Sequence, residues 1–82
     1  MTNDQITKFL ISLNQSTIID IKFKKRPAIR GIFVNVNDSE HLKSKNLWRI
    51  ITESHLEDWK KTKDMGLSRI YNGSDFTKLK IQ

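Results

Sequence analysis

The sequence predicts a small α+β domain, mostly β, in which an N-terminal helix precedes a five-stranded antiparallel barrel. Three observations support this fold class. The chain opens with an apolar stripe at helical spacing, period-two alternation begins near Thr17, and turn-forming clusters divide the rest into short apolar segments. Five short connected strands can each bury one face and leave few edges exposed when they curl into a partly open barrel.

The length and composition indicate one domain of 82 residues, with a helix and linker over 1–16 and the barrel over 17–82. There is no cysteine, so neither a disulfide nor a thiolate metal site supports this small core, and a homo-oligomer interface is the remaining common aid. The first residues carry the acid Asp4 and lack the basic start and apolar centre of a signal peptide. We therefore expect a cytoplasmic protein without a membrane segment.

The first predicted element is a helix over residues 4–13, capped by Thr2 or Asn3. Its apolar positions are three and four residues apart, which is the spacing of one helix face: Ile6, Phe9, Leu10 and Leu13. Because a helix of about three turns is marginal alone, this face is expected to dock on the barrel.

A long hairpin follows the helix. Ile19, Ile21 and Phe23 alternate with polar residues in the first strand, and residues 28–36 form the second. A loop over residues 25–27 aligns both apolar faces and places Lys22 opposite Arg30. Beyond Gly31 the second strand is apolar on both sides, so it is either buried on both faces or bent from one sheet into another.

The remaining segments are shorter. Residues 40–45 are predicted as an exposed loop, and residues 47–52 as a third strand. Ser54 and Glu57 have capping-box spacing, which favours a short helix over 54–61, with an irregular excursion as the alternative. Residues 67–71 and 76–81 are predicted to form a closing hairpin around Asn72-Gly73-Ser74, with Ile70 opposite Phe76.

The net charge of +6, from fifteen basic against nine acidic residues, favours an anionic partner, although eleven of the fifteen are lysines that codon bias also explains. The densest basic stretch is KFKKRPAIRG. Lys22 and Arg30 would repel each other across the hairpin, which marks them as functional. The candidate nucleic-acid contacts in this stretch are Lys22, Lys24, Lys25, Arg26 and Arg30.

Trp48 and Arg49 are a further candidate pair, because neighbouring strand positions put the indole on one face and the guanidinium on the other. An exposed tryptophan beside cations can stack on an unpaired base, whereas a buried one fills the core. Trp59 and Tyr71 also have charged neighbours. For Trp48 both readings stay open.

No catalytic or cofactor motif is evident. His41 and His55 lie in segments expected to be exposed, with only ordinary loop acids near them, so we predict no metal site, cofactor or enzymatic activity. Glu57 and Asp58 are adjacent, so on a helix they diverge. The sequence favours binding over catalysis.

The order of elements resembles the Sm-like family of small barrels, which includes bacterial RNA-chaperone hexamers. The similar stretch is IIDIKFKKRPAIRGIFVNVND, with Gly31 in the second strand and Asp38 at its end. The resemblance implies an RNA-binding ring in which Asp38 and Asn46 face a central pore and Arg69 lies near the second family motif.

The chain departs from the family where residues 39–45 precede the third strand, and where RIYNGSDF replaces the second motif. An SH3-like barrel that binds proteins has the same strand order. The leading hypothesis is thus a bacterial RNA-binding or other nucleic-acid-binding protein. The alternative is a protein-interaction module, either an SH3-like adaptor or a homo-oligomeric assembly protein.

Overall fold

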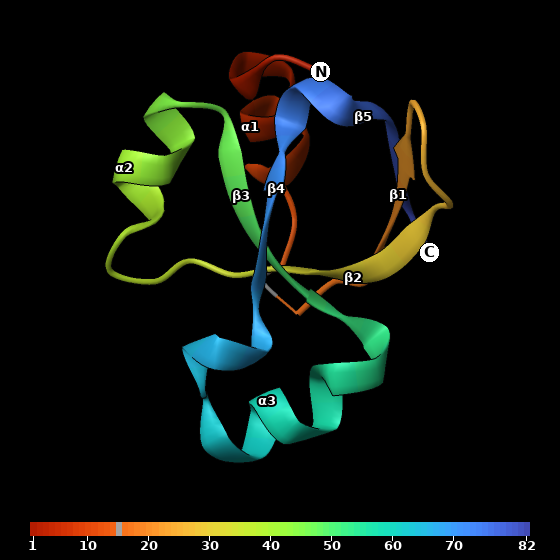
Figure 1. Cartoon of the computed structure of the whole chain (residues 1–82). Coiled ribbons are helices and arrows are strands. Elements are labelled where there is room, and N and C mark those ends of the chain that lie inside the picture. Colours follow the sequence, from red (N-terminus) through yellow and green to blue (C-terminus); the bar gives the residue numbers. More distant parts are fainter. Residues whose placement is uncertain (15) are drawn as a thin grey trace.

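The structure is a computed structural model that describes residues 1–14 and 16–82. An N-terminal helix precedes a five-stranded antiparallel sheet with strand order β4-β3-β2-β1-β5, which confirms the predicted α+β class (Figure 1). The elements are α1 (Asn3–Leu10), β1 (Ile19–Phe23), β2 (Ile29–Phe33), α2 (Ser39–Ser44), β3 (Leu47–Thr52), the 3-10 turn η1 (Glu53–His55), α3 (Leu56–Thr62), η2 (Met65–Leu67), β4 (Arg69–Asn72), η3 (Gly73–Asp75) and β5 (Phe76–Ile81).

Helix α1 begins as the sequence predicts. The Thr2 hydroxyl accepts a hydrogen bond from the Gln5 backbone N–H (3.2 Å), and the Gln5 side chain accepts one from the Thr2 N–H (3.0 Å), which forms a capping box. Ile6 is fully buried, and Phe9 and Leu10 pack beside it against the sheet. The helix lies at the top of the view in Figure 1, behind the upper part of β4.

The register of β1 against β2 differs from the prediction. Arg30 lies opposite Asp20, not Lys22, and the connecting loop spans residues 24–28. The two registers differ by two residues, so every side chain keeps its face and hydrophobic matching could not distinguish them. The observed one pairs the Arg30 Nε with the Asp20 Oδ1 at 2.8 Å. The predicted repulsion between Lys22 and Arg30 is therefore wrong.

The predicted closing hairpin of β4 and β5 is also wrong. β4 pairs with β3, placing Ile70 opposite Arg49, and β5 pairs with β1, placing Leu79 opposite Ile21. The turn η3 separates the two strands, and the Asn72 side chain accepts a hydrogen bond from the Ser74 N–H (2.9 Å). Within the described residues, β4 and β5 are opposite edges of the sheet with no ladder between them.

Apolar side chains fill both sides of the central strands. The first cluster, between α1 and the sheet, comprises Ile6, Ile19, Ile21, Trp48, Ile50, Phe76 and Leu79. The second, between the sheet and α3, comprises Ile32, Ile51, Leu56 and Trp59. Beyond Gly31, Ile32 belongs to the second cluster and the half-buried Phe33 packs against the first, so both faces of β2 contact the core. The two clusters also explain why β3 shows no simple alternation.

Two helices lie outside the sheet at different ends of the view in Figure 1. Helix α2 replaces the exposed loop predicted over residues 40–45. The Ser39 hydroxyl at its start accepts a hydrogen bond from the Val36 N–H (2.8 Å), and the Leu42 N–H bonds to the Asp38 carbonyl (3.0 Å).

Helix α3 confirms the predicted short helix, although its capping box does not form. It follows η1, and the Ser54 hydroxyl contacts the Thr52 hydroxyl (3.2 Å) instead of a helix N–H. No helix in residues 1–14 or 16–82 is long and apolar enough to cross a membrane.

Candidate nucleic-acid interface

The eight residues that the sequence singles out fall into three separate places. Four cations gather around the β1–β2 loop and the start of β4: Lys24, Lys25, Arg26 and Arg69. Lys22 and Arg30 lie on the outward faces of β1 and β2. Trp48 and Arg49, in β3, are engaged in internal contacts, so only the first group forms a candidate interface.

Trp48 is a core residue, so its predicted alternative role in base stacking is wrong. Its side chain is 4% exposed, in phase with Ile50, and its ring meets Phe33 edge-on at 5.9 Å between centroids. Its indole N–H donates a hydrogen bond to the Asn46 Oδ1 (2.9 Å). Asn46 has a left-handed backbone (φ 58°), and its Nδ2 donates to the Met1 carbonyl (2.9 Å), so its side chain is used internally.

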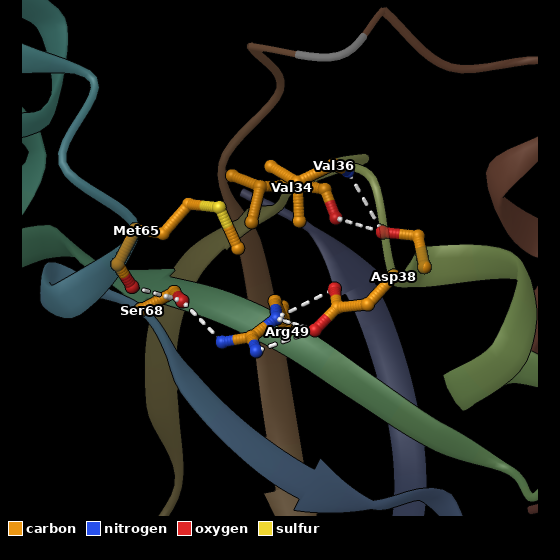
Figure 2. Close-up of polar contacts among 7 residues, drawn as sticks. Val34, Val36, Asp38, Arg49, Met65 and Ser68 are labelled. Atoms are coloured by element: carbon orange, nitrogen blue, oxygen red, sulfur yellow. Dashed lines mark hydrogen bonds and ion pairs between the residues drawn. The ribbon is translucent and has the colours of Figure 1, made fainter.

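Arg49 is paired, not available as a free cation. Its guanidinium donates three hydrogen bonds to Asp38, from Nη2 to Oδ2 at 2.6 Å and from Nε to Oδ1 at 2.9 Å and Oδ2 at 3.2 Å. A fourth goes from Nη1 to the Ser68 hydroxyl (3.1 Å), as Figure 2 shows. These hydrogen bonds lower the pKa of Asp38 and raise the pKa of Arg49. The group therefore ties β3 to the start of α2 and to the end of η2.

The four gathered cations surround a patch of aromatic and apolar side chains. We call this the loop–β4 surface, and it comprises Phe23, Lys24, Lys25, Arg26, Pro27, Arg69, Ile70 and Tyr71. Two adjoining shallow hollows share Arg26, Ile70 and Tyr71. The only acid lining either hollow is Asp75, so the surface has an excess of positive charge.

The geometry of the loop–β4 surface depends on Arg26. Its guanidinium carbon lies 5.5 Å from the Phe23 ring centroid and 5.6 Å from that of Tyr71, within cation–π range of both. The two rings are 5.6 Å apart, and both are half-buried. The Lys24 N–H donates to the Asp75 carbonyl (2.9 Å), which attaches the loop to η3.

The sequence indicates the loop cations as candidates, but it does not indicate that residues of β4 lie beside them. In the sequence, Tyr71 is distinguished only by its charged neighbours. The predicted hairpin pairs Ile70 with Phe76 as core residues, whereas the Ile70 side chain is 46% exposed. The two segments are more than forty positions apart in the chain, and the wrong β4–β5 hairpin hid their contact. No local signal in either segment identifies the other.

The outward face of β1 carries a different cationic group. Lys22 lies opposite Lys78, and Asp20 lies opposite both Lys80 and Arg30. Asp20 compensates Arg30, but Lys22 and Lys78 are like charges at directly opposed positions. The repulsion that the sequence placed between β1 and β2 thus lies between β1 and β5.

The two histidines do not form part of a metal-binding group among the described residues. His41 is on α2 and His55 is in η1, and both are exposed. Across the described residues, no three His, Cys, Asp or Glu side chains are grouped so that they could hold one metal ion.

Comparison with protein-family models finds no match to this chain, and neither the curated proteins nor the solved structures match it.

Proposed function

We propose that the chain is a non-catalytic bacterial protein of the cytoplasm that binds single-stranded RNA, or another nucleic acid, through the loop–β4 surface. The observation that carries this proposal is the grouping of four cations around two half-buried rings, with one acid among the lining residues. Cations that follow a phosphate backbone beside rings that stack on bases are the composition of single-strand binding sites.

The Sm-like resemblance agrees with this function in its element order, because helix α1 precedes the first of five antiparallel strands. The resemblance is weaker at the individual residues that it implies would contact RNA. Asp38 and Asn46, which it would direct to a pore, form internal hydrogen bonds, whereas Arg69 lies on the loop–β4 surface. A homo-oligomeric ring remains part of the proposal. Light scattering of the purified protein, which gives the molar mass of the assembly in solution, tests whether the ring forms.

The salt dependence of binding tests the interface. Each phosphate contact lowers log affinity by about 0.7 per tenfold rise in salt for a single strand, so four cations give a slope of about −2.8. Affinity for a labelled single-stranded RNA of about 20 nucleotides should then fall roughly 50-fold between about 50 and 200 mM salt. Fluorescence anisotropy over that range measures the slope.

A charge-matched pair of double variants locates the contacts. Lys24→Gln/Lys25→Gln should reduce the slope to about −1.4, since two of the four contacts are removed. Lys8→Gln/Lys45→Gln removes the same charge from exposed positions on α1 and after α2, outside both hollows, and should keep the slope of the unmodified chain. A flat salt response, or equal slopes in the two variants, contradicts the proposal.

A protein-interaction module is the second candidate, and the edges of the sheet favour it. Ile70 on β4 and Ile81 on β5 are 46% and 50% exposed, and each lies on an edge strand that can accept a further strand. In this case Ile81→Thr, at an edge position outside both hollows, should abolish partner capture or self-association while leaving RNA affinity unchanged. If the chain is instead a nucleic-acid-binding protein, Lys24→Gln/Lys25→Gln should lower RNA affinity more than the edge-strand variant does.

A further inference from the structure

A second hollow lies away from the loop–β4 surface, between α1, α2 and the β2–β3 strands. Its volume is about 140 Å³. Its apolar lining comes mainly from the end of α1, the end of β2, α2 and the start of β3. Ile19 and Trp48 are buried there, whereas five other large side chains are only half-buried: Leu10, Leu13, Phe33, Leu42 and Leu47. Water in the apolar part of the hollow has few hydrogen-bonding partners, so an apolar group can displace it there favourably.

The size of the hollow limits what can enter. A cavity of about 150 Å³ lined by Leu, Ile and Phe accommodates one benzene molecule. The present volume of about 140 Å³ therefore suits one six-membered ring or a short branched chain. Larger ring systems would require α1 or α2 to move.

The polar lining favours a negative charge at the rim. Two lining residues are cations, Lys43 and Arg49, and none is an acid. Asp38 already neutralises Arg49, so Lys43 provides the unbalanced charge. The Lys43 Nζ lies 6.0 Å from the Trp48 ring centroid, and its acidic contact is Glu40 at 3.7 Å, a carboxylate that is 85% exposed. Such an exposed pair is weak and easily exchanged.

Ser39 supplies a second donor on the same face of α2. It is one helical turn before Lys43 and only 8% exposed, and its hydroxyl accepts the Val36 N–H at 2.8 Å. The same hydroxyl donates to the Val34 carbonyl at 3.5 Å, at the outer limit of hydrogen bonding. A carboxylate oxygen in the hollow would be a better acceptor, because ionised acceptors form shorter and stronger bonds.

We propose that this hollow binds a small organic monoanion, whose ring or branched chain fills the apolar part and whose carboxylate meets Lys43 and Ser39. The site shares no residue with the loop–β4 surface, so this proposal can be tested independently of nucleic-acid binding. Its anionic group is held by side chains one turn apart on α2, the helix that the sequence did not predict.

Three ligands of similar shape test the charge requirement: phenylacetate, neutral phenylacetamide and cationic phenethylamine. Titrations followed by ¹H–¹⁵N NMR should show phenylacetate binding with a dissociation constant on the order of 1 mM, as expected for a ligand of about ten heavy atoms. The shifted amides should belong to α1, α2 and the start of β3, together with the Trp48 indole N–H. The amide should bind several-fold more weakly, and the amine should not bind.

A matched pair of variants tests Lys43. Lys43→Gln should raise the dissociation constant of phenylacetate about three- to five-fold and leave that of phenylacetamide unchanged. Lys45→Gln removes an equal charge nearby, outside the hollow, and should change neither. No saturable shift with phenylacetate up to about 20 mM, equal binding of all three ligands, or shifts confined to another surface would overturn the proposal.

Discussion

Replacement of Gly31 by alanine tests how closely β2 and β3 approach each other. A Cβ atom added at Gly31 would overlap the Ile51 carbonyl oxygen and lie 3.1 Å from the Ile50 Cγ2. The oxygen belongs to the backbone of β3, where Ile51 is paired with Ile32, so it cannot move without disturbing the ladder. Overpacking of this kind costs about 1–3 kcal/mol.

The expected loss of stability in Gly31→Ala is large for a chain of this size. An 82-residue domain has a free energy of unfolding of roughly 4–12 kcal/mol. A cost of about 2 kcal/mol should lower the melting temperature by about 8–16 °C, because 1 kcal/mol corresponds to about 4–8 °C at this size. Thermal unfolding followed by circular dichroism, together with urea titration, measures both quantities.

Gly66→Ala is the control. Its added Cβ would lie 3.1 Å from the Asp64 Oδ1, an exposed side-chain atom that accepts the Gly66 N–H (2.8 Å) and needs to shift only slightly, and Gly66 is itself exposed. None of the described glycines has a positive φ, so conformational strain does not distinguish the two sites. Gly66→Ala should change stability by less than about 0.5 kcal/mol. A Gly31→Ala protein that melts within about 3 °C of the unmodified chain would refute the reasoning.

Three further predictions concern charge and capping. Because the pKa of Asp38 is lowered in the folded chain, its pairing with Arg49 stabilises the fold fully at pH values above the ordinary pKa of 3.8, and this stabilisation is lost as the pH falls through the folded pKa. Asp38→Asn should therefore lower the urea midpoint of unfolding at neutral pH, and the difference from the unmodified chain should disappear in acid. Lys78→Gln should stabilise the protein by roughly 0.2–1 kcal/mol in low salt, because it removes the charge opposite Lys22, and urea unfolding should show no such gain for Lys45→Gln. Thr2→Ala should cost about 1 kcal/mol in the same assay through loss of the α1 cap, whereas an unchanged midpoint would mean that the cap contributes nothing.

The sequence is most informative where the pattern is local. Thr2, which caps α1, is one of the two caps that the sequence predicts, and the alternation of Ile19, Ile21 and Phe23 gives the buried face of β1. The strand at residues 47–52 was predicted with its observed bounds. These features depend on contacts between residues a few positions apart, or on the period of one strand, which the sequence displays directly.

Strand pairing is less well determined by the sequence. A two-residue shift of β1 against β2 keeps every side chain on its face, so the longer loop and the Arg30–Asp20 ion pair, not the apolar pattern, distinguish the observed register. Asn72-Gly73-Ser74 suggested a hairpin because Asn-Gly usually marks one, yet β4 and β5 each pair with another strand.

The sequence by itself determined the α+β class, the N-terminal helix, the short helix after β3 and the basic character of the β1–β2 loop. Only the tertiary structure decided which cations lie together. It buried Trp48, paired Arg49 with Asp38, and brought Tyr71 and Arg69 of β4 beside Arg26. The physical reason is that burial and ion pairing depend on neighbours supplied by distant segments, whereas helical and strand periodicity depend on the segment alone.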